Sequence, residues 1–301
     1  MVLVTGGTGF IGKKLINCLV LSGFKCILLS RKPIEGLKTI ICDLVEERIE
    51  QKDLKGIDTI FHLAGFTHDT NSIKNERLYQ LLNVDATIHL ADLAGKSGVK
   101  RFIFVSSVKA CSSNLEESYL TESNQFKPEG VYGKTKREAE LKILEIGLKY
   151  KMHVSVIRPS LVYGPEVKGN LRMMIEGIKK GWFPPLPETG NRRSMIHVDD
   201  VVSSLLLVAN CKDANGEIYI ATDGQAYSSR EIYETICIVN RKSVPNWSIP
   251  VFFFSLIGLM STNLSYKVNK LMGSEFYHSD KLKSIGFSAS KTFRDMNESS
   301  F

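Results

Sequence analysis

The sequence predicts an α/β fold in which a doubly wound parallel sheet is followed by a smaller C-terminal α/β region. Three observations predict it. Short β-branched runs alternate with longer stretches of helical periodicity, and a glycine-rich turn joins the first run to the first helix. After Pro159 the expected helices and strands become shorter. With 301 residues and 43% hydrophobic composition, the chain can bury one large core or two smaller ones.

The elements follow from these patterns in chain order. Strands are expected at 1–4, 26–29, 39–42, 59–63, 102–105 and 154–157, and helices at 10–20, 76–96, 132–150, 171–180, 200–210 and 229–239. The apolar stretch 249–260 is shorter than the ~20 residues that span a bilayer. We expect it to form a helix packed on the core, with a membrane-surface role as the alternative.

The glycine-rich turn TGGTGFIG occupies residues 5–12, with Gly6, Gly9 and Gly12 spaced three apart. Missing Cβ atoms let this backbone approach a ligand, and the N-terminus of the following helix offers free N–H groups to phosphate. A turn without a ligand is disfavoured, because strand, turn and helix come in the order of a dinucleotide site. The pattern predicts a Rossmann dinucleotide-binding domain over 1–160 and a partly interleaved substrate-binding domain over 161–301.

The end of the second strand bears on the choice of dinucleotide. It reads Ser30-Arg31-Lys32, where an enzyme specific for NAD usually presents an acidic residue to the ribose 2′-hydroxyl. An arginine accommodates a 2′-phosphate instead. Arg31 therefore predicts NADP as the cofactor. The alternative is that Arg31 stacks on adenine and NAD binds.

A candidate acid/base pair lies in the helix expected at 132–150. Tyr132 and Lys136 are four residues apart and share one helix face. An ammonium near a phenol favours the phenolate, so we expect the pKa of Tyr132 to fall from about 10 toward neutrality. By itself the pair is a weak signal, because surface Tyr/Lys pairs at this spacing are common.

Further motifs raise its specificity. HLAG occurs at 62–65, NVDAT at 83–87, GVKRFIFVSS at 98–107, YGKTK at 132–136, RPSLVYGP at 158–165 and IHVDDV at 196–201. With the glycine turn, they make nearly the whole chain resemble the extended short-chain dehydrogenase/reductase family. This group contains nucleotide-sugar epimerases, dehydratases and 4-ketoreductases.

The resemblance implies a role for each matched position. Tyr132 would be the general acid/base, Lys136 would bind the nicotinamide ribose, and Ser107 would hold the substrate hydroxyl or carbonyl. Asp43 would meet the adenine or, equally, cap a helix starting near Val45. With Tyr132 and Lys136, the implied cofactor-binding residues are Gly6, Thr8, Gly9, Phe10, Ile11, Gly12, Arg31, Asp43, Leu44, Leu63, Ala64, Gly65, Asn83, Ser106 and Pro159.

The resemblance also implies a substrate site. Besides Ser107, it would contain Lys109, Asn170 and Arg193, with the Asn and the Arg against a diphosphate. The alternative for Arg193 is a solvated loop. Asp199 is expected to cap the helix that follows it and to have no catalytic role.

The resemblance is strongest to bacterial reductases and epimerases of UDP-linked 2-acetamido sugars in surface-polysaccharide pathways. Because Arg31 favours NADP, we expect reduction of the C4 ketone of a UDP-linked 4-keto-6-deoxy sugar. The alternative is a UDP-hexose or UDP-N-acetylhexosamine 4-epimerase. A 4,6-dehydratase of the family would need Asp-Glu after the serine, where this chain has Val108-Lys109, so dehydration is disfavoured. From other classes, an NADP-sensing regulator and a reductase of hydrophobic, sterol-type ketones remain, the latter suggested by Phe252-Phe253-Phe254.

The distribution of charges and cysteines limits the kinds of partner that the sequence predicts. The net charge of +7 is dispersed without a basic run, so no nucleic acid is expected. The six cysteines are scattered without metal-ligand spacing, so no metal site is expected. We expect a cytoplasmic protein without an integral membrane segment or secretory leader. The resemblance implies a homodimer formed by the helices at 76–96 and 132–150.

Overall fold

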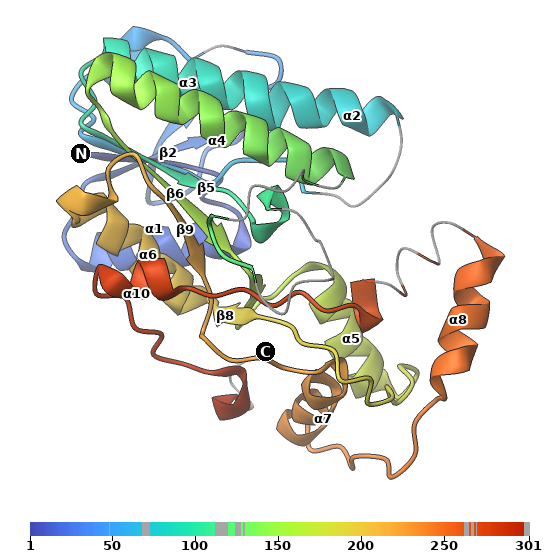
Figure 1. Ribbon diagram of the computed structural model, residues 1–301. Coiled ribbons are helices and arrows are strands. Elements are labelled where there is room, and N and C mark those ends of the chain that lie inside the picture. The colour runs from blue at the N-terminus through green and yellow to red at the C-terminus, as the bar shows by residue number, and fades with distance from the viewer. Residues whose placement is uncertain are drawn as a thin grey trace.

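All seven strands of the main sheet run parallel (Figure 1). The computed structural model describes residues 1–47, 49–67, 73–111, 120–123, 128, 130–261, 265, 268 and 270–297. In spatial order the strands are β3 (Lys38–Ile41), β2 (Cys26–Ser30), β1 (Val2–Thr5), β4 (Thr59–His62), β5 (Arg101–Val105), β6 (His153–Pro159) and β9 (Ile218–Ala221). The predicted doubly wound sheet is confirmed.

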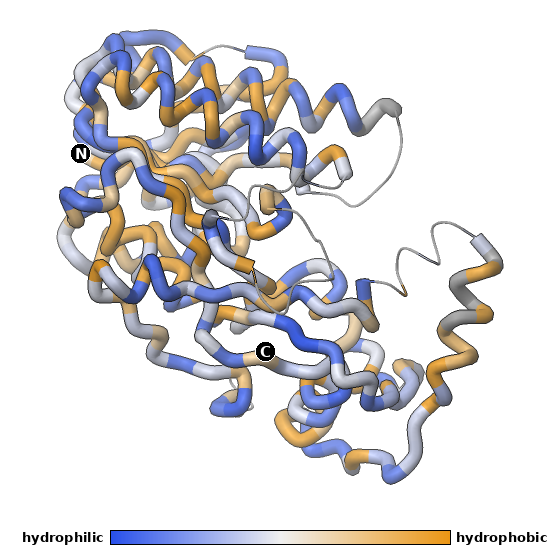
Figure 2. The backbone as a smooth tube through the Cα atoms, viewed as in Figure 1, coloured by the Kyte–Doolittle hydropathy of each residue, from blue (hydrophilic) through white to orange (hydrophobic). Residues whose placement is uncertain are grey.

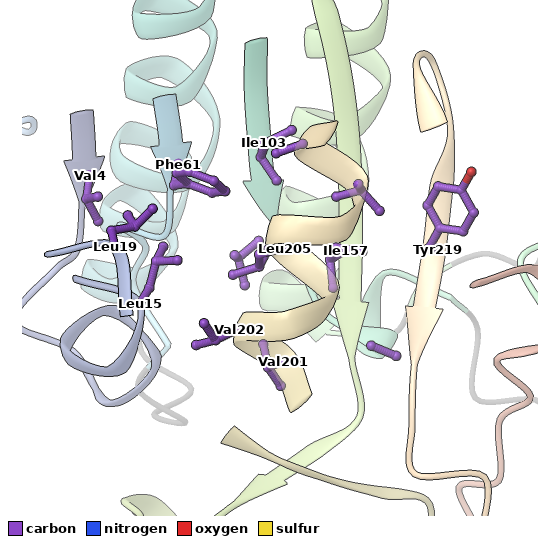
Figure 3. Close-up of a cluster of buried hydrophobic side chains, with 14 of the residues drawn as sticks. Val4, Leu15, Leu19, Phe61, Ile103, Ile157, Val201, Val202, Leu205 and Tyr219 are labelled. Atoms are coloured by element: carbon purple, nitrogen blue, oxygen red, sulfur yellow. The ribbon is translucent and has the colours of Figure 1, made fainter. Parts of the chain in front are cut away.

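Alternation along the strands divides the apolar side chains between two cores. Successive side chains of a strand point to opposite faces, so Val4 and Ile103 pack on one side and Leu3 and Phe102 on the other. The first core is covered by α1 (Phe10–Leu21) and α6 (Val198–Asn210). Figure 3 shows Leu15 and Leu19 of α1 and Val201 and Leu205 of α6 directed at this face of the sheet.

The opposite face is covered by a long helical layer (Figure 1). It consists of α2 (Ile73–Tyr79), the π-helical η2 (Gln80–Asp85), α3 (Ala86–Lys96) and α4 (Gly130–Tyr150). The prediction of one regular α-helix over 76–96 is therefore wrong for residues 80–85, which are π-helical. A π-helical turn inserts an extra residue and re-aims the side chains around it, and here it contains the buried Asn83.

The region after β6 builds a smaller layer at the carboxyl end of the sheet. β7 (Leu161–Tyr163) and β8 (Met195–His197) pair in parallel, and α5 (Gly169–Lys180) and α7 (Ser229–Val239) form a third apolar cluster beside them. Further short helical elements, in different parts of the molecule, are η1 (Gln51–Leu54), η3 (Val108–Ala110), η4 (Lys212–Ala214), α10 (Asp280–Ser284) and η5 (Phe293–Asp295). Because β9 and α6 return to the main sheet, the two regions interleave.

The helix α8 (Val251–Met260) departs from the prediction that it packs on the core. Figure 2 shows it as a hydrophobic stretch at the margin of the molecule. Phe254 is buried, but Phe252 and Leu259 are 57% and 83% exposed. The segment is helical as expected, yet it leaves most of its described apolar side chains uncovered. Among the described residues, no helix is long and apolar enough to cross a membrane.

A buried ion pair joins the sheet to α4. Arg158 in β6 donates from Nε to Glu140 Oε1 at 2.8 Å and from Nη2 to Oε2 at 2.6 Å, and its Nη1 donates to Cys111 Sγ at 2.8 Å. The Arg158 and Glu140 side chains are 2% and 0% exposed. Two parallel charge-assisted bonds fix both position and orientation, so this pair sets where α4 lies on the sheet.

Breaking this pair should destabilise the fold. We expect Arg158→Met to lower the free energy of unfolding by about 3–5 kcal/mol, because Glu140 is left buried without its main partner. Urea denaturation measures the change. Lys142→Ala, which removes the exposed Lys142–Glu145 pair on the same helix, is the matched control and should have little effect. A loss below about 1 kcal/mol for Arg158→Met would contradict the assignment.

Candidate active site

The carboxyl ends of the parallel strands bring the predicted site residues to one edge of the sheet. The glycine turn follows β1, Leu63 follows β4, Ser106 follows β5, and Pro159 is the last residue of β6. In an open parallel sheet this edge is where ligands bind. The topology therefore gathers at one edge residues that lie far apart in the sequence.

The turn between β1 and α1 approaches the end of β4 closely. Gly6 has a φ of +67°, and a Cβ placed on it would lie 2.6 Å from the backbone nitrogen of Ala64. Gly9 is the N-cap of α1 without a side-chain cap, and the first helical turn, from Phe10 through Gly12, contains no acidic residue. The N–H groups of this turn are thus available to an anion. This cradle, which also includes Thr8 and Ile11, fits a dinucleotide pyrophosphate.

The ends of β2 and β3 carry the two residues predicted at the adenosine. Arg31 is exposed, directly after β2. Asp43 accepts a hydrogen bond from the Val45 backbone nitrogen at 2.9 Å, and Leu44 is buried. The expected helix at Val45 is wrong, because the chain forms only a turn there and Asp43 caps that turn.

The loop after β4 is tied to α4 through Asn83. Its Oδ1 accepts from the Phe66 nitrogen at 2.7 Å, and its Nδ2 donates to the Phe66 carbonyl at 3.1 Å and to Thr135 Oγ1 at 3.3 Å. Gly65 lies against both Asn83 and Lys136. Asn83 thus fixes the loop that contains Leu63, Ala64 and Gly65, so it is a positioning residue in this structure.

His62 is an uncharged, buried side chain that supports this loop through hydrogen bonds. Its Nδ1 lies 2.7 Å from Thr5 Oγ1 and its Nε2 lies 2.8 Å from Thr87 Oγ1. Burial, assisted by the Lys136 charge, lowers the pKa of His62 to about 3. The imidazole is uncharged at neutral pH and links β1, β4 and α3.

Tyr132 and Ser107 face each other at the end of β5. A Cβ on Gly133 would lie 2.2 Å from the Lys109 carbonyl oxygen, so the glycine allows α4 to approach η3 and brings Tyr132 to Ser107. Burial raises the pKa of Tyr132 to about 12, although a hydrogen bond with Ser107 opposes the shift. The expected lowering is therefore wrong for this geometry, because lost hydration outweighs favourable contacts of the phenolate.

Lys136 lies one helical turn further along α4 and is itself buried. Its Nζ donates to the Val105 carbonyl at 3.0 Å and lies 4.5 Å from the centre of the Phe104 ring. Burial lowers the pKa of Lys136 to about 8, while Glu140 acts in the opposite direction. Near it, the Ser106 side-chain oxygen is buried without a partner, as is that of Ser160 at the end of β6. These donors and acceptors fit a ribose.

A cavity of about 370 Å³ lies in the smaller region. It brings together Asn170 of α5 and Arg193 before β8, two residues predicted from the sequence. The prediction missed the rest of the lining, which is mostly apolar: Leu161, Leu171, Met173, Met174, Phe183, Ser229, Ile232, Lys270 and Leu271. Arg193 also donates from Nη1 to the carbonyls of Lys270 and Gly273.

Glu275 interacts with two of the predicted substrate-binding residues, Lys109 and Arg193. Lys109 forms an ion pair with it, and Arg193 Nη2 lies 3.9 Å from its Oε2. Burial opposes ionisation of Glu275, but these two cations outweigh it and hold its pKa below the usual range. Nothing in the sequence indicates Glu275, which follows Arg193 by more than 80 residues. Glu140 could have been found, since it continues the helix face of Tyr132 and Lys136.

The start of α6 corrects one further expectation. His197, not Asp199, is the N-cap: its Nδ1 accepts from the Asp199 nitrogen at 3.2 Å. Asp199 forms an ion pair with Lys291 at 2.6 Å instead. The neighbouring Asp200 accepts three hydrogen bonds from Ser290 and Lys291. The paired carboxylates thus hold the C-terminal segment against α6.

Comparison with known proteins agrees with this geometry. Residues 2–221 match the NAD dependent epimerase/dehydratase family. The chain belongs to this family. A UDP-glucose 4-epimerase of Vibrio cholerae is 31% identical over 261 residues, 83% of this chain and 78% of that protein. The resemblance to extended short-chain dehydrogenases/reductases is thereby confirmed, and the family is one of NAD-dependent enzymes.

Two further relatives cover almost the whole chain. The N-acetyl-alpha-D-glucosaminyl-diphospho-ditrans,octacis-undecaprenol 4-epimerase of Escherichia coli O157:H7 is 24% identical over 97% of this chain and 91% of that protein. The structure of MoeE5 in complex with UDP-glucuronic acid and NAD is 25% identical, with a TM-score of 0.80 over 98% of this chain and 95% of that chain.

The glycine cradle makes a direct prediction. Gly6→Ala should weaken NAD binding at least about tenfold, because the new methyl group must displace the Ala64 backbone at the pyrophosphate cradle. Isothermal titration with NAD measures this. Gly36→Ala is a matched control: it has a similar φ of +76° but nothing within 4 Å of the added Cβ, so it isolates the strain of the left-handed backbone. Equal NAD affinity in the two variants would contradict a cradle at Gly6.

Proposed function

We propose that this protein is a 4-epimerase of UDP-linked sugars, acting on a UDP-hexose or a UDP-N-acetylhexosamine. The observation that carries the proposal is the half-buried Tyr132, whose phenol is hydrogen-bonded to Ser107 at the edge of the sheet where the glycine cradle also lies. Two of the relatives described above are 4-epimerases by name. They favour the epimerase over the 4-ketoreductase that the sequence first suggested.

The residues at the sheet edge divide the work of holding NAD. The first turn of α1 would bind the pyrophosphate, Lys136 would bind the nicotinamide ribose, and Asn83 would keep the intervening loop in place. When bound, NAD supplies the acceptor and later the donor of a hydride at the sugar C4. Since epimerisation involves no net oxidation or reduction, the protein needs no second substrate to restore the cofactor.

Tyr132 would carry the proton. As the C4–H bond breaks, the C4 hydroxyl would give its proton to the Tyr132 phenolate, and Tyr132 would return the proton to the sugar O4 when the C–H bond re-forms on the opposite face. Burial is the largest cause of the raised pKa of the free Tyr132 phenol. We propose that the cationic Lys136, one turn away, favours the phenolate during catalysis. Ser107 would hold the sugar oxygen in hydrogen-bond reach of Tyr132.

The smaller region would bind the nucleotide part of the substrate. Its cavity combines apolar walls with Asn170, Arg193 and Lys270, a composition that suits a base flanked by a diphosphate. Glu275 would orient Arg193 and Lys109 for this contact. We accordingly assign substrate binding to residues 161–301, with dinucleotide binding in 1–160, and keep the homodimer through α3 and α4 as part of the proposal.

Epimer formation without added cofactor tests the proposal. The purified protein should convert UDP-glucose or UDP-N-acetylglucosamine into its C4 epimer, as followed by NMR. Tyr132→Phe should lower kcat by about 10²–10⁴-fold because only the proton-carrying oxygen is lost, whereas Tyr150→Phe at the other end of α4 should not. No epimer from the wild-type protein, or more than about a tenth of its kcat in Tyr132→Phe, would contradict the proposal.

One observation favours the reductase as a second candidate. Arg31 is exposed directly after β2, where it could contact a 2′-phosphate, and exchangeable NADPH suits a net reduction. A 4-ketoreductase would oxidise NADPH in the presence of a UDP-linked 4-keto sugar and would form no epimer from UDP-glucose.

Titration of both reduced cofactors separates the two candidates. If Arg31 contacts the 2′-phosphate, the charge-assisted pair is worth about 1.5–3 kcal/mol, or about 10- to 150-fold tighter binding of NADPH. Arg31→Asp should then reverse the preference, because a carboxylate repels the phosphate and accepts from a free ribose hydroxyl. Nicotinamide fluorescence gives both affinities. Equal or NADH-favouring affinity in the wild-type protein would remove the support for the reductase, and NAD retained through purification would favour the epimerase.

A further inference from the structure

Helix α8 and the two loops that follow α5 and α7 expose several large apolar side chains, which we treat as one surface. Its members are Trp182, Trp247, Phe252, Phe253, Leu256 and Leu259, which we call the α8 surface and which are between 47% and 83% exposed. The two loops run side by side, since the Ile249 nitrogen donates to the Pro185 carbonyl at 3.1 Å. Large apolar patches of this kind mark interaction sites.

The distribution of side chains around α8 indicates what covers it. Phe252, Leu256 and Leu259 are spaced i, i+4 and i+7 on the face opposite the buried Phe254, and Phe253 extends the exposed apolar arc. The helix contains no charged residue. A protein partner covers one face and leaves a polar rim, whereas a lipid surface surrounds an inserted helix on several sides.

Charge and aromatic composition agree with a lipid partner. Residues 235–274 contain four cations, Arg241, Lys242, Lys267 and Lys270, and no Asp or Glu. At the end of α5, Lys179 and Lys180 are exposed beside Trp182. Tryptophan prefers the interface between lipid and water, and exposed lysines attract anionic headgroups.

We propose that the α8 surface docks this protein on an anionic lipid bilayer, with α8 lying in the interface rather than crossing it. Ten residues make a helix of only about 15 Å, half the thickness of the hydrocarbon core. Phe254 of α8 belongs to the same apolar cluster as Phe183 and Leu271, which line the candidate substrate cavity. Docking therefore brings that cavity to the membrane surface. The inference goes beyond the proposed function and does not depend on it.

Vesicle binding tests the inference, and the protein contains its own probe. Both of its tryptophans, Trp182 and Trp247, belong to the α8 surface. With vesicles of phosphatidylcholine and phosphatidylglycerol, the protein should co-sediment and its tryptophan emission should shift to shorter wavelength. Binding to phosphatidylcholine alone should be weaker, and salt should reduce the difference.

A double variant assigns the contact to α8. Phe252→Ser/Leu256→Ser should lower vesicle affinity at least about tenfold, because two apolar side chains no longer enter the lipid. Leu21→Ser, which removes a 79% exposed leucine from α1, should leave it unchanged. Circular dichroism verifies that both variants fold. Absence of vesicle binding by the wild-type protein would overturn the proposal. So would a double variant that keeps full vesicle binding but loses self-association, since a second copy would then cover α8.

Discussion

The buried ion pair between Arg158 and Glu140 is the interaction on which the rest of the site depends. It joins strand β6 to α4 through two hydrogen bonds in an environment that excludes water. Tyr132 and Lys136 lie on the same face of α4, two turns and one turn before Glu140, respectively. Any shift of α4 along the sheet would therefore move Tyr132 and Lys136, the candidate acid/base pair, relative to Ser107 and the glycine cradle.

Burial is the second constraint, and it sets the protonation states at the edge of the sheet. It raises the pKa of Tyr132 to about 12, lowers that of Lys136 to about 8 and keeps His62 neutral. A neutral His62 can hold Thr5 and Thr87 without adding charge near Lys136. Lys136, one helical turn from Tyr132, is thus held as a buried cation whose pKa lies close to physiological pH.

The smaller region is held together by contacts between residues that lie far apart in the sequence. Glu275 pairs with Lys109 from the end of β5 and approaches Arg193. Asp200 accepts hydrogen bonds from Ser290 and Lys291. The Lys109–Glu275 pair links the two regions, and Arg193, which Glu275 also approaches, lines the candidate substrate cavity. The exposed α8 stands beside this cavity, so a surface that contacts lipid would also set the direction from which the cavity faces the bilayer.

The sequence by itself determined the parallel sheet, the glycine cradle and the spacing of Tyr132 and Lys136, because these follow from periodicity and from contacts between near neighbours. It also indicated Asn170 and Arg193 through resemblance to a family. Only the tertiary structure revealed Glu275, the protonation state of Tyr132 and the exposure of α8. The physical reason is that these features depend on burial and on partners far along the chain. The apolar run 249–260 has the same sequence pattern whether or not it is buried. The pKa of a phenol follows its hydration rather than its position in a motif.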